Sequence, residues 1–474
     1  MNMMLQKNDP KLIRAWTFYD WANSVFPLCI TSAIFPNFYD KVTSKLVTTL
    51  SAPADSPDLQ HLIHLLNNQQ LYSYNKIEQN HQVTMEIFNH QVQFMGSSFN
   101  SSEIYSYVYS FALFVVVLIV PVLSGIADYF GNKKRFLQFF CYLGSFSCMS
   151  IYFFNPEKLA LSFIPFITAT IGFWASLVYY NSYLPEIADE SSQDRVSARG
   201  FAMGYFGSSI LLIICLSLII GVGKEFTRYS FFLVGLWWMG FAQFTFFRLP
   251  AKSGGHSRKS GDKIFTKGFK EIKTVFLDAI KQKGLKRFLL SYFFYNMGVQ
   301  TVLVMAVLFA RKEIIWEDEK TKTNSLIVSI LLIQFLGIAG SYLFSYVSRK
   351  LGNIKTIGLI ISLWMGVCVY TYFIVRQPIH FFIVAATVGF VMGGIQSLSR
   401  STYSKLLPDT QDHASYFSLY DVLEKLGMII GTVTFGLISQ LTGGMRNSVL
   451  VLIVFFLMGI LVLITVPKMK KIKA

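Results

Sequence analysis

The chain has 474 residues, of which 53% are hydrophobic and only 14% are charged, and its mean hydropathy is +0.47. A soluble domain carries about a quarter charged residues, so the composition excludes an ordinary soluble enzyme and predicts a polytopic membrane protein. The formal net charge of +16 is compatible with nucleic-acid binding only if the basic residues gather on one surface, and their distribution along the chain indicates otherwise.

Twelve apolar segments are each long enough to cross a bilayer as a helix, which takes about 20 residues. Their bounds are roughly 16–40, 103–127, 136–154, 160–182, 201–222, 229–247, 288–310, 324–346, 355–375, 379–399, 416–438 and 447–466. An even number of spans places both termini on one side. Because that side holds most of the 42 Lys and Arg residues, the positive-inside rule predicts that both termini are cytoplasmic.

The first span carries polar side chains where a lipid-facing helix would carry leucines. Asp20, Asn23 and Ser24 fall on one face at helical spacing. Ionisable residues inside a membrane span usually face a bundle interior or a water-filled cavity. We therefore predict that this face lines a cavity; the alternative is that Asp20 reaches the cytoplasmic interface and only orients the helix.

The first predicted outer segment, about residues 41–102, is long for a connection between membrane helices. It is rich in Asn, Gln and Ser, and residues 59–66 have the pattern of a short amphipathic helix. His61 and His64 are three residues apart and could share a metal ion on such a helix. No third ligand is apparent, so no metal site is predicted.

A cytoplasmic turn between the second and third spans has the composition of a gate. Gly125 and Gly131 allow a tight turn close to a neighbouring helix, and Asp128 can cap or pair at a helix end. The segment from Gly125 to Arg135 resembles the Gly-x-x-x-Asp-x-x-Gly-Arg-Lys loop of the major facilitator superfamily, with Asn132 in place of the arginine.

This turn has a second copy after the eighth span, in residues 343–355. The copies share a Gly-Asn-x-Lys core, but Arg349 stands near the position of Asp128, so the two predicted gates differ in charge. A Leu-Pro-acid sequence likewise follows the fourth and the tenth spans. The common offset of about 220 residues predicts two related six-helix halves with a solute site between them. Their bounds are 1–247 and 288–474.

The halves are joined by a basic segment, residues 248–287. Its lysines and arginines alternate with phenylalanine and isoleucine at helical spacing. This pattern is typical of an amphipathic helix that lies on an anionic membrane surface, here the inner leaflet. The bilayer, and not nucleic acid, is therefore the predicted partner of the positive charge.

Polar faces also occur on the fourth, seventh and tenth spans, which with the first are the cavity-lining helices of the superfamily. We predict a solute-binding set of Asp20, Asn23, Ser24, Asn181, Asn296, Gln300, Gln396 and Arg400. For each of these residues, a purely structural hydrogen bond between helices is an equally good interpretation.

The eleventh span holds the densest charge cluster. Asp421 and Lys425 are one helical turn apart and are predicted to pair, which leaves Glu424 in need of another partner; Arg400 is a candidate. The predicted ion-coupling set consists of Asp20, Asp421, Glu424 and Lys425. Within it, Asp20 or Glu424 would carry a proton. The alternative is a structural clamp at the gate formed by Gly125, Asp128, Gly131 and Arg349.

Four motifs together resemble the vacuolar amino-acid exporter family associated with autophagy, whose bacterial members form the unknown major facilitator family. They are Tyr-Asp-Trp-Ala-Asn-Ser at Tyr19–Ser24, Asn-Ser-Tyr-Leu-Pro-Glu at Asn181–Glu186, Gly-Phe-Ala-Met-Gly-Tyr at Gly200–Tyr205, and Leu-Tyr-Asp at Leu419–Asp421 with Lys425. The resemblance implies an all-α protein with twelve transmembrane helices in two pseudo-symmetric bundles, and an amino acid or related zwitterion as solute. The style of the chain favours a bacterial inner membrane.

These features predict a monomeric secondary active transporter that moves a small solute by alternating access, coupled to a proton. An enzyme is not predicted, because no His-Glu-x-x-His, Gly-x-Ser-x-Gly or phosphate-binding glycine motif is present. The five cysteines lie in apolar segments without regular spacing, so no cofactor or disulfide is predicted either. The alternative function is a transporter-fold sensor or assembly partner that acts through the long outer segment.

Overall fold

The computed structural model describes residues 6–53, 56–57, 72–79, 82–250, 264–316 and 319–467. Within these residues, eleven helices are long and apolar enough to cross a bilayer. Each overlaps one of the predicted spans. The remaining predicted span, the first, corresponds to an almost continuous helical segment from Pro10 to Thr43. The predicted helical membrane fold is therefore confirmed.

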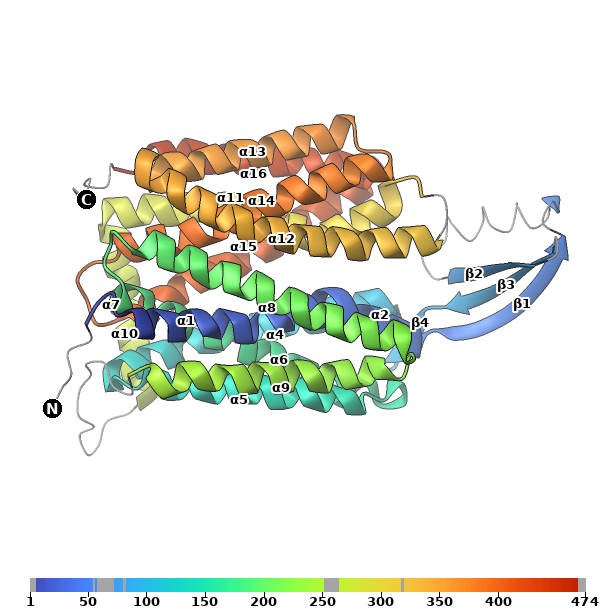
Figure 1. Cartoon of the computed structure of the whole chain (residues 1–474), viewed down its shortest axis with the longest axis horizontal. Coiled ribbons are helices and arrows are strands. Elements are labelled where there is room, and N and C mark those ends of the chain that lie inside the picture. The colour runs from blue at the N-terminus through green and yellow to red at the C-terminus, as the bar shows by residue number, and fades with distance from the viewer. Residues whose placement is uncertain are drawn as a thin grey trace.

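The first half of the chain forms one bundle and the second half forms another, lying beside it (Figure 1). The first half comprises α1 (Pro10–Asn23), the π-helix η1 (Phe26–Ile34), α2 (Phe35–Thr43), α4 (Ser101–Phe130), α5 (Lys133–Ser150), α6 (Leu159–Asn181), α7 (Leu184–Ile187), α8 (Gln193–Gly221) and α9 (Phe226–Arg248). The second half comprises α11 (Lys283–Glu313), α12 (Glu319–Leu351), α13 (Asn353–Phe373), α14 (Pro378–Leu406), α15 (His413–Thr442) and α16 (Met445–Ile464).

The halves meet through two pairs of contacts: α8 packs against α12 and α14, and α15 packs against α4 and α6. Helix α1 begins and α16 ends at the same end of the molecule, which we call the terminus end (Figure 1). The opposite end, which carries the strands, is called the strand end.

The first membrane segment changes its helical form at Pro27. Proline has no N–H to donate, so it interrupts the α-helical ladder. The hydroxyls of Thr31 and Ser32 donate to the Pro27 carbonyl at 2.7 and 2.8 Å, and the chain continues as the π-helix η1. Such wide turns are frequent at functional sites, and this one directly follows the polar face that begins at Asp20.

The linker contains helix α10 (Ile264–Lys281), which packs against α4, α11 and α15 at the terminus end. Val275 and Ala279 are buried in this contact, whereas Phe269 and Phe276 remain exposed. Helix α10 approaches α4 closely, because a Cβ atom on Gly125 would lie 2.5 Å from the Gly268 carbonyl oxygen. The predicted amphipathic helix therefore has one face on the bundle and a second apolar face exposed.

The outer segment contains strands that the sequence analysis did not predict. The strands β1 (Lys45–Pro53), β3 (Gln82–Asn89) and β2 (Tyr72–Gln79) form an antiparallel sheet in that order, and β4 (Gln91–Phe94) pairs with β5 (Ser97–Asn100). Val83, Met85 and Ile87 are buried and alternate with less buried residues, which is the period-2 pattern of a strand. The candidate helix at 59–66, with His61 and His64, lies outside the described residues.

One half-exposed carboxylate, that of Asp40, ties this outer segment to the membrane bundle. Asp40 Oδ1 accepts a hydrogen bond from Ser101 Oγ at 2.7 Å and lies 2.8 Å from His90 Nδ1. The Ser101 amide also donates to the His90 carbonyl at 2.9 Å. The end of α2, the β3–β4 connection and the start of α4 are thus held together at the strand end.

Candidate functional site

A buried ion pair between the two halves lies at the centre of the site. Asp20 on α1 is 4% exposed, and its Oδ2 atom lies 3.3 Å from both Nη1 and Nη2 of Arg400 on α14. The Tyr180 hydroxyl, from α6, donates to the same oxygen at 2.7 Å. The predicted cavity residue Asp20 therefore has partners in both halves of the protein.

Arg400 belongs to the second half, but its guanidinium group is bound by the first half. Its Nε donates to Ser197 Oγ and its Nη2 to the Ser197 carbonyl, both at 2.9 Å, and its Nη1 donates to Asn181 Oδ1 at 3.1 Å. It also lies over three rings, at 4.1–5.6 Å from their centroids: Phe201, Trp16 and Tyr180. Cation–π contacts and charge-assisted hydrogen bonds together stabilise the desolvated cation.

The glycines of α8 make room for this ion pair. A Cβ atom on Gly200 would collide with Asp20 Oδ2 and would lie 2.8 Å from Arg400 Nη2. A Cβ on Gly204 would collide with Ser24 Oγ one turn further along. These glycines therefore allow α8 to pack closely against α1, and at Gly200 the close approach accommodates the charged pair itself.

A second charged cluster lies on α15. Asp421 and Lys425 form the predicted ion pair within one turn. Lys425 is fully buried, and its Nζ atom lies 3.6 Å from Glu424 Oε2. The same Nζ atom lies 3.6 Å from the centroid of the Trp174 ring, which comes from α6 in the first half. This cluster, like the first, therefore joins the two halves.

Glu424 binds amide groups of α11 and not the predicted arginine. Gln300 Nε2 donates to Glu424 Oε1 at 2.7 Å, and Asn296 Nδ2 donates to the Glu424 carbonyl at 3.3 Å. The prediction that Arg400 pairs with Glu424 is wrong, because the guanidinium group is already engaged by Asp20, Asn181 and Ser197. With 18% of its side chain exposed, Glu424 is the more accessible carboxylate of the α15 cluster.

The structure divides the predicted solute-binding residues into neighbouring groups. Arg400 joins Asp20 and Asn181 in the first cluster, while Asn296 and Gln300 join the α15 cluster. Gln396 accepts a hydrogen bond from the Tyr205 hydroxyl at 2.6 Å across the interface of the halves. Ser24 Oγ donates to Asn23 Oδ1 at 3.4 Å, whereas Asn23 Nδ2 is buried and has no hydrogen-bond partner among the described residues.

The predicted gate turn contacts the other half at the terminus end. The Asp128 carboxylate accepts hydrogen bonds from the amides of Ala414 and Ser415, at 3.2 and 2.6 Å. These amides lie at the N-terminus of α15, where the helix dipole favours a negative charge. Gly131 ends α4 with a φ of 63°, a left-handed conformation that favours glycine.

A second pair of contacts strengthens this gate. Lys133, at the start of α5, forms an ion pair with Glu186 of α7. Glu186 Oε1 also lies 2.9 Å from Nδ1 of His413, the first residue of α15. The Leu-Pro-Glu sequence after the fourth span thus reaches the second half at the same helix N-terminus that Asp128 caps.

The second copy of the turn makes a gate through a residue that the sequence analysis missed. Asp194, in the first turn of α8, accepts hydrogen bonds from Ser348 Oγ at 2.9 Å and Asn353 Nδ2 at 2.8 Å, and it forms a 2.7 Å ion pair with Lys405. Arg349 is exposed and lies over the Tyr346 ring of its own helix. The missing acid of the second copy is thus supplied by the opposite half.

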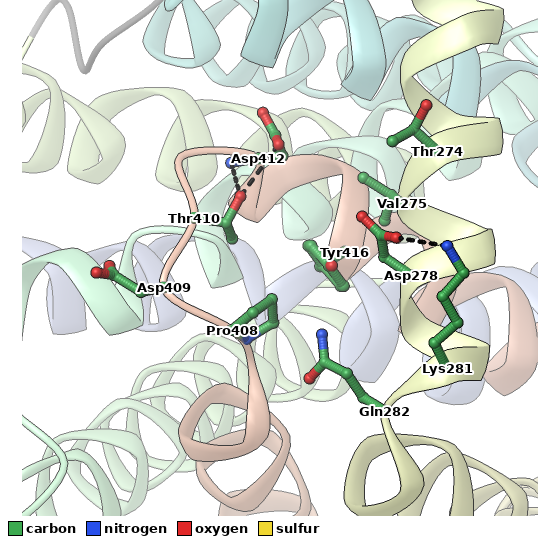
Figure 2. Close-up of a pocket in the computed structure, with 10 residues that line it drawn as sticks. All are labelled: Thr274, Val275, Asp278, Lys281, Gln282, Pro408, Asp409, Thr410, Asp412 and Tyr416. Carbon is green, nitrogen blue, oxygen red and sulfur yellow. Dashed lines mark hydrogen bonds and ion pairs between the residues drawn. The ribbon is translucent and has the colours of Figure 1, made fainter.

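A surface pocket of about 270 Å³ lies at the terminus end, between α10 and residues 408–416 (Figure 2). Asp278 and Lys281 form a 3.7 Å ion pair on its α10 side, and Thr410 Oγ1 donates to Asp412 on its other side at 3.0 Å. None of the predicted solute or coupling residues lines it. Its place between the linker helix and a loop separates it from the polar clusters between the halves.

Comparison with known proteins gives a single family. Residues 8–474 match the family described as "Vacuole effluxer Atg22 like". An uncharacterized MFS-type transporter of Bacillus subtilis, YxiO, is 29% identical over 98% of this chain and 96% of its own. Autophagy-related protein 22 of Yarrowia lipolytica is 24% identical, over 80% of this chain and 78% of its own.

Solved transporters of the major facilitator superfamily share the fold. The transporter FucP in its outward conformation aligns with a TM-score of 0.62 and 12% identity, covering 98% of this chain and 99% of its own. The human organic anion transporter MFSD10 aligns with a TM-score of 0.63 and 10% identity, covering 97% and 100%. At these identities the likeness concerns the fold alone.

Proposed function

The chain belongs to the family of Atg22-like vacuole effluxers, integral membrane transporters of the major facilitator type, and we propose that it moves a small zwitterionic solute by alternating access. The observation that carries this proposal is the Asp20–Arg400 ion pair. It is buried, it joins the two halves, and a family of this fold transports by moving one half against the other. The positive-inside distribution of the basic residues supports a cytoplasmic terminus end.

Several polar contacts between the halves lie toward the terminus end, which supports a state closed on that side, whereas at the strand end Arg311 Nη2 donates to Asn37 Oδ1 at 3.3 Å on an exposed surface. Asp128 binds the start of α15, and Asp194 binds Lys405 near the end of α14. Asp20 binds Arg400, which precedes Lys405 by five residues on the same helix. Opening toward the terminus end requires that all of these contacts separate. Of the three, only the Asp20–Arg400 pair lies deep enough to meet a solute in the bundle.

We infer that the solute replaces this ion pair when the halves separate. Separation would leave Asp20 and Arg400 as unpaired buried charges, which is strongly unfavourable. A zwitterion has an ammonium group for Asp20 and a carboxylate for the Arg400 guanidinium, whose fork geometry suits a carboxylate. Asn23 Nδ2, which has no hydrogen-bond partner among the described residues, supplies a neutral donor one helical turn from Asp20. An amino acid has the required charges.

The test is solute exchange by the purified protein in liposomes. Proteoliposomes loaded with a mixture of unlabelled amino acids should accumulate a labelled amino acid by counterflow, whereas those loaded with sugars or nucleosides should not. A screen of melting temperature against the same compounds should give an upward shift for the transported solute only, since a ligand of the folded state raises apparent stability. Counterflow of sugars alone would contradict the zwitterion proposal.

We propose that Glu424 carries the coupling proton. Among the buried carboxylates of the coupling set, Asp20 is held by an arginine and Asp421 by Lys425. Glu424 has the Gln300 amide as its nearest partner, lies 3.6 Å from the Lys425 ammonium that Asp421 binds more closely, and is 18% exposed. Because its ion pair with Lys425 is the longer of the two and its side chain is the more exposed, Glu424 can gain and lose a proton at lower cost than Asp421, so it is the better carrier.

Replacement of Glu424 by glutamine should separate coupling from transport. We expect Glu424→Gln to retain amino-acid counterflow, because the Gln300 contact can be kept, and to lose solute accumulation driven by a pH gradient. Solute-driven proton flux, followed with a pH-sensitive dye in the vesicles, measures the change, and Glu313→Gln at the strand end of α11 is the matched control. Proton flux in Glu424→Gln equal to the native rate would exclude this residue as the carrier.

The outer sheet supports a second candidate function, partner recognition. Among the described residues, its order β1-β3-β2 places β1 and β2 at the two edges without a further paired strand, and sheet edges readily pair with another chain. Lys45 and Asn89 are opposite each other in the ladder, so a short Gly-Ser turn can replace the residues between them. We expect counterflow to survive this deletion. A partner that binds the native protein in native membranes but not this variant would favour the sensor or assembly function.

A further inference from the structure

The β4–β5 hairpin ends in a turn whose residue choice is unusual. Met95 and Gly96 both have positive φ, 49° and 82°, as in the two-residue turns that normally hold Asn-Gly or Asp-Gly. A non-glycine residue in this conformation is uncommon, and the residues enriched there are Asn, Asp and His. Met95 is nevertheless 84% exposed. A long apolar side chain thus occupies a tip position that local backbone chemistry would give to a small polar one.

An apolar groove lies beneath this hairpin, against the first turns of α4. It has a volume of about 250 Å³ and is lined mainly by Phe94, Met95 and Phe99 of the hairpin and by Ile104, Tyr107 and Val108 of α4. The rings of Phe99 and Tyr107 meet edge to face, with centroids 6.3 Å apart. Aromatic residues with a polar tip are typical of the level of the membrane–water interface.

The groove is continuous with the lipid-facing surface of α4. Exposed apolar side chains follow one face of this membrane-spanning helix at helical spacing, each more than half exposed: Tyr107 60%, Phe111 55%, Phe114 54% and Leu118 56%. Tyr107 belongs to both surfaces. The helix begins at Ser101 with a capping box from Asn100 and Glu103, so the polar boundary of the bilayer falls next to the hairpin.

We propose that the β4–β5 hairpin inserts its Met95 tip into the bilayer leaflet at the strand end, and that its groove holds a phospholipid acyl chain. The occupant follows from continuity, because the groove opens onto a helix face that lies in lipid. The Asp40–His90–Ser101 contacts fix the base of the hairpin to the bundle. Tip and base together hold the outer sheet at a fixed orientation above the membrane. This inference does not depend on the solute or on its coupling.

Site-directed spin labelling in lipid vesicles tests the insertion. All five native cysteines are buried, so a cysteine introduced as Met95→Cys can be labelled selectively. In phosphatidylcholine–phosphatidylglycerol vesicles, the label should collide frequently with oxygen, which concentrates in lipid, and severalfold less with a water-soluble nickel chelate than a control label does. The control is Thr49→Cys on β1, an exposed position on the sheet that projects beyond the bundle (Figure 1).

A second position and a lipid-resident quencher make the result decisive. Ser97→Cys, exposed on the same hairpin, keeps Met95 and serves if the Met95 variant does not fold. A bimane label at either position should be quenched more by a nitroxide near the headgroup end of an acyl chain than by one near its methyl end. Nickel accessibility equal to that of the Thr49 label would overturn the proposal, and so would protection in native membranes but not in vesicles of the purified protein.

Discussion

Asp20→Asn is expected to abolish solute transport and to lower the melting temperature of the purified protein. The substitution keeps the shape of the side chain but leaves the Arg400 guanidinium buried without its carboxylate. Removing one partner of a buried ion pair costs about 3–5 kcal/mol, which corresponds to a loss of more than about 100-fold in an equilibrium constant. Counterflow in proteoliposomes and thermal unfolding in detergent measure the two effects.

The double variant Asp20→Asn/Arg400→Gln separates stability from function. Because neither charge then remains, the double variant should be more stable than either single variant, whereas transport should stay absent since both solute contacts are gone. Asp40→Asn is the control: it removes a hydrogen-bonded, half-exposed carboxylate from the same membrane segment at the strand end, and transport should survive. Full transport by the double variant would show that the pair has only a structural role.

Asp194→Asn is expected to shift the protein toward the state open at the terminus end. Lys405 and Asp194 are 9% and 4% exposed, so the neutral variant leaves a nearly buried ammonium without its counter-ion. Because this unpaired charge is buried only in the closed state, the population of the closed state should fall at least about tenfold relative to the open state. The rate of alkylation of a cysteine placed at Ser397, which is buried between the halves, should rise accordingly.

Arg349→Gln is the control for this gate. It tests whether Arg349, the residue predicted from the sequence, or Asp194, the residue found in the structure, holds the gate closed. Arg349 was predicted as a gate residue because it occupies the position of Asp128 in the second copy. It is exposed and contacts a ring of its own helix, so its variant should leave the alkylation rate at Ser397 unchanged. A large increase in Arg349→Gln together with no increase in Asp194→Asn would contradict the assignment of Asp194.

The membrane fold could be predicted because it depends on local properties of the chain. Each span is a run of apolar residues, and the Asp421–Lys425 pair follows from helical spacing alone. The capping of a helix by Asp128 could be anticipated from the gate turn, although not that it binds Ala414 and Ser415. The outer strands carry a local signal as well, since Val83, Met85 and Ile87 alternate with polar residues, but the polar composition of the segment obscured it.

The partner choices between the halves could not be predicted, because they depend on packing. Asp20 and Arg400 are 380 positions apart, and the sequence offered Arg400 equally to Glu424. The Arg400 guanidinium binds the first half because it finds four acceptors there: the Asp20 carboxylate, the Asn181 amide oxygen, and the hydroxyl and carbonyl oxygens of Ser197. These acceptors meet only when α1, α6 and α8 pack together. The sequence carried one indirect signal for Asp194. The second copy of the gate turn has no acidic residue at the position of Asp128, so an acidic residue of the facing helix has to take that role.

Reversible crosslinking of the two halves at the terminus end tests the account most directly. Ser197 Oγ donates to the Ser397 carbonyl across the interface at 2.8 Å, so these two residues are adjacent, and cysteines introduced at both positions are to be crosslinked by a bifunctional thiol reagent with a cleavable disulfide in proteoliposomes. Crosslinking is expected to stop counterflow and a reductant to restore it, whereas neither single-cysteine variant should respond. Undiminished counterflow by the fully crosslinked protein would contradict transport by separation of the halves at this end.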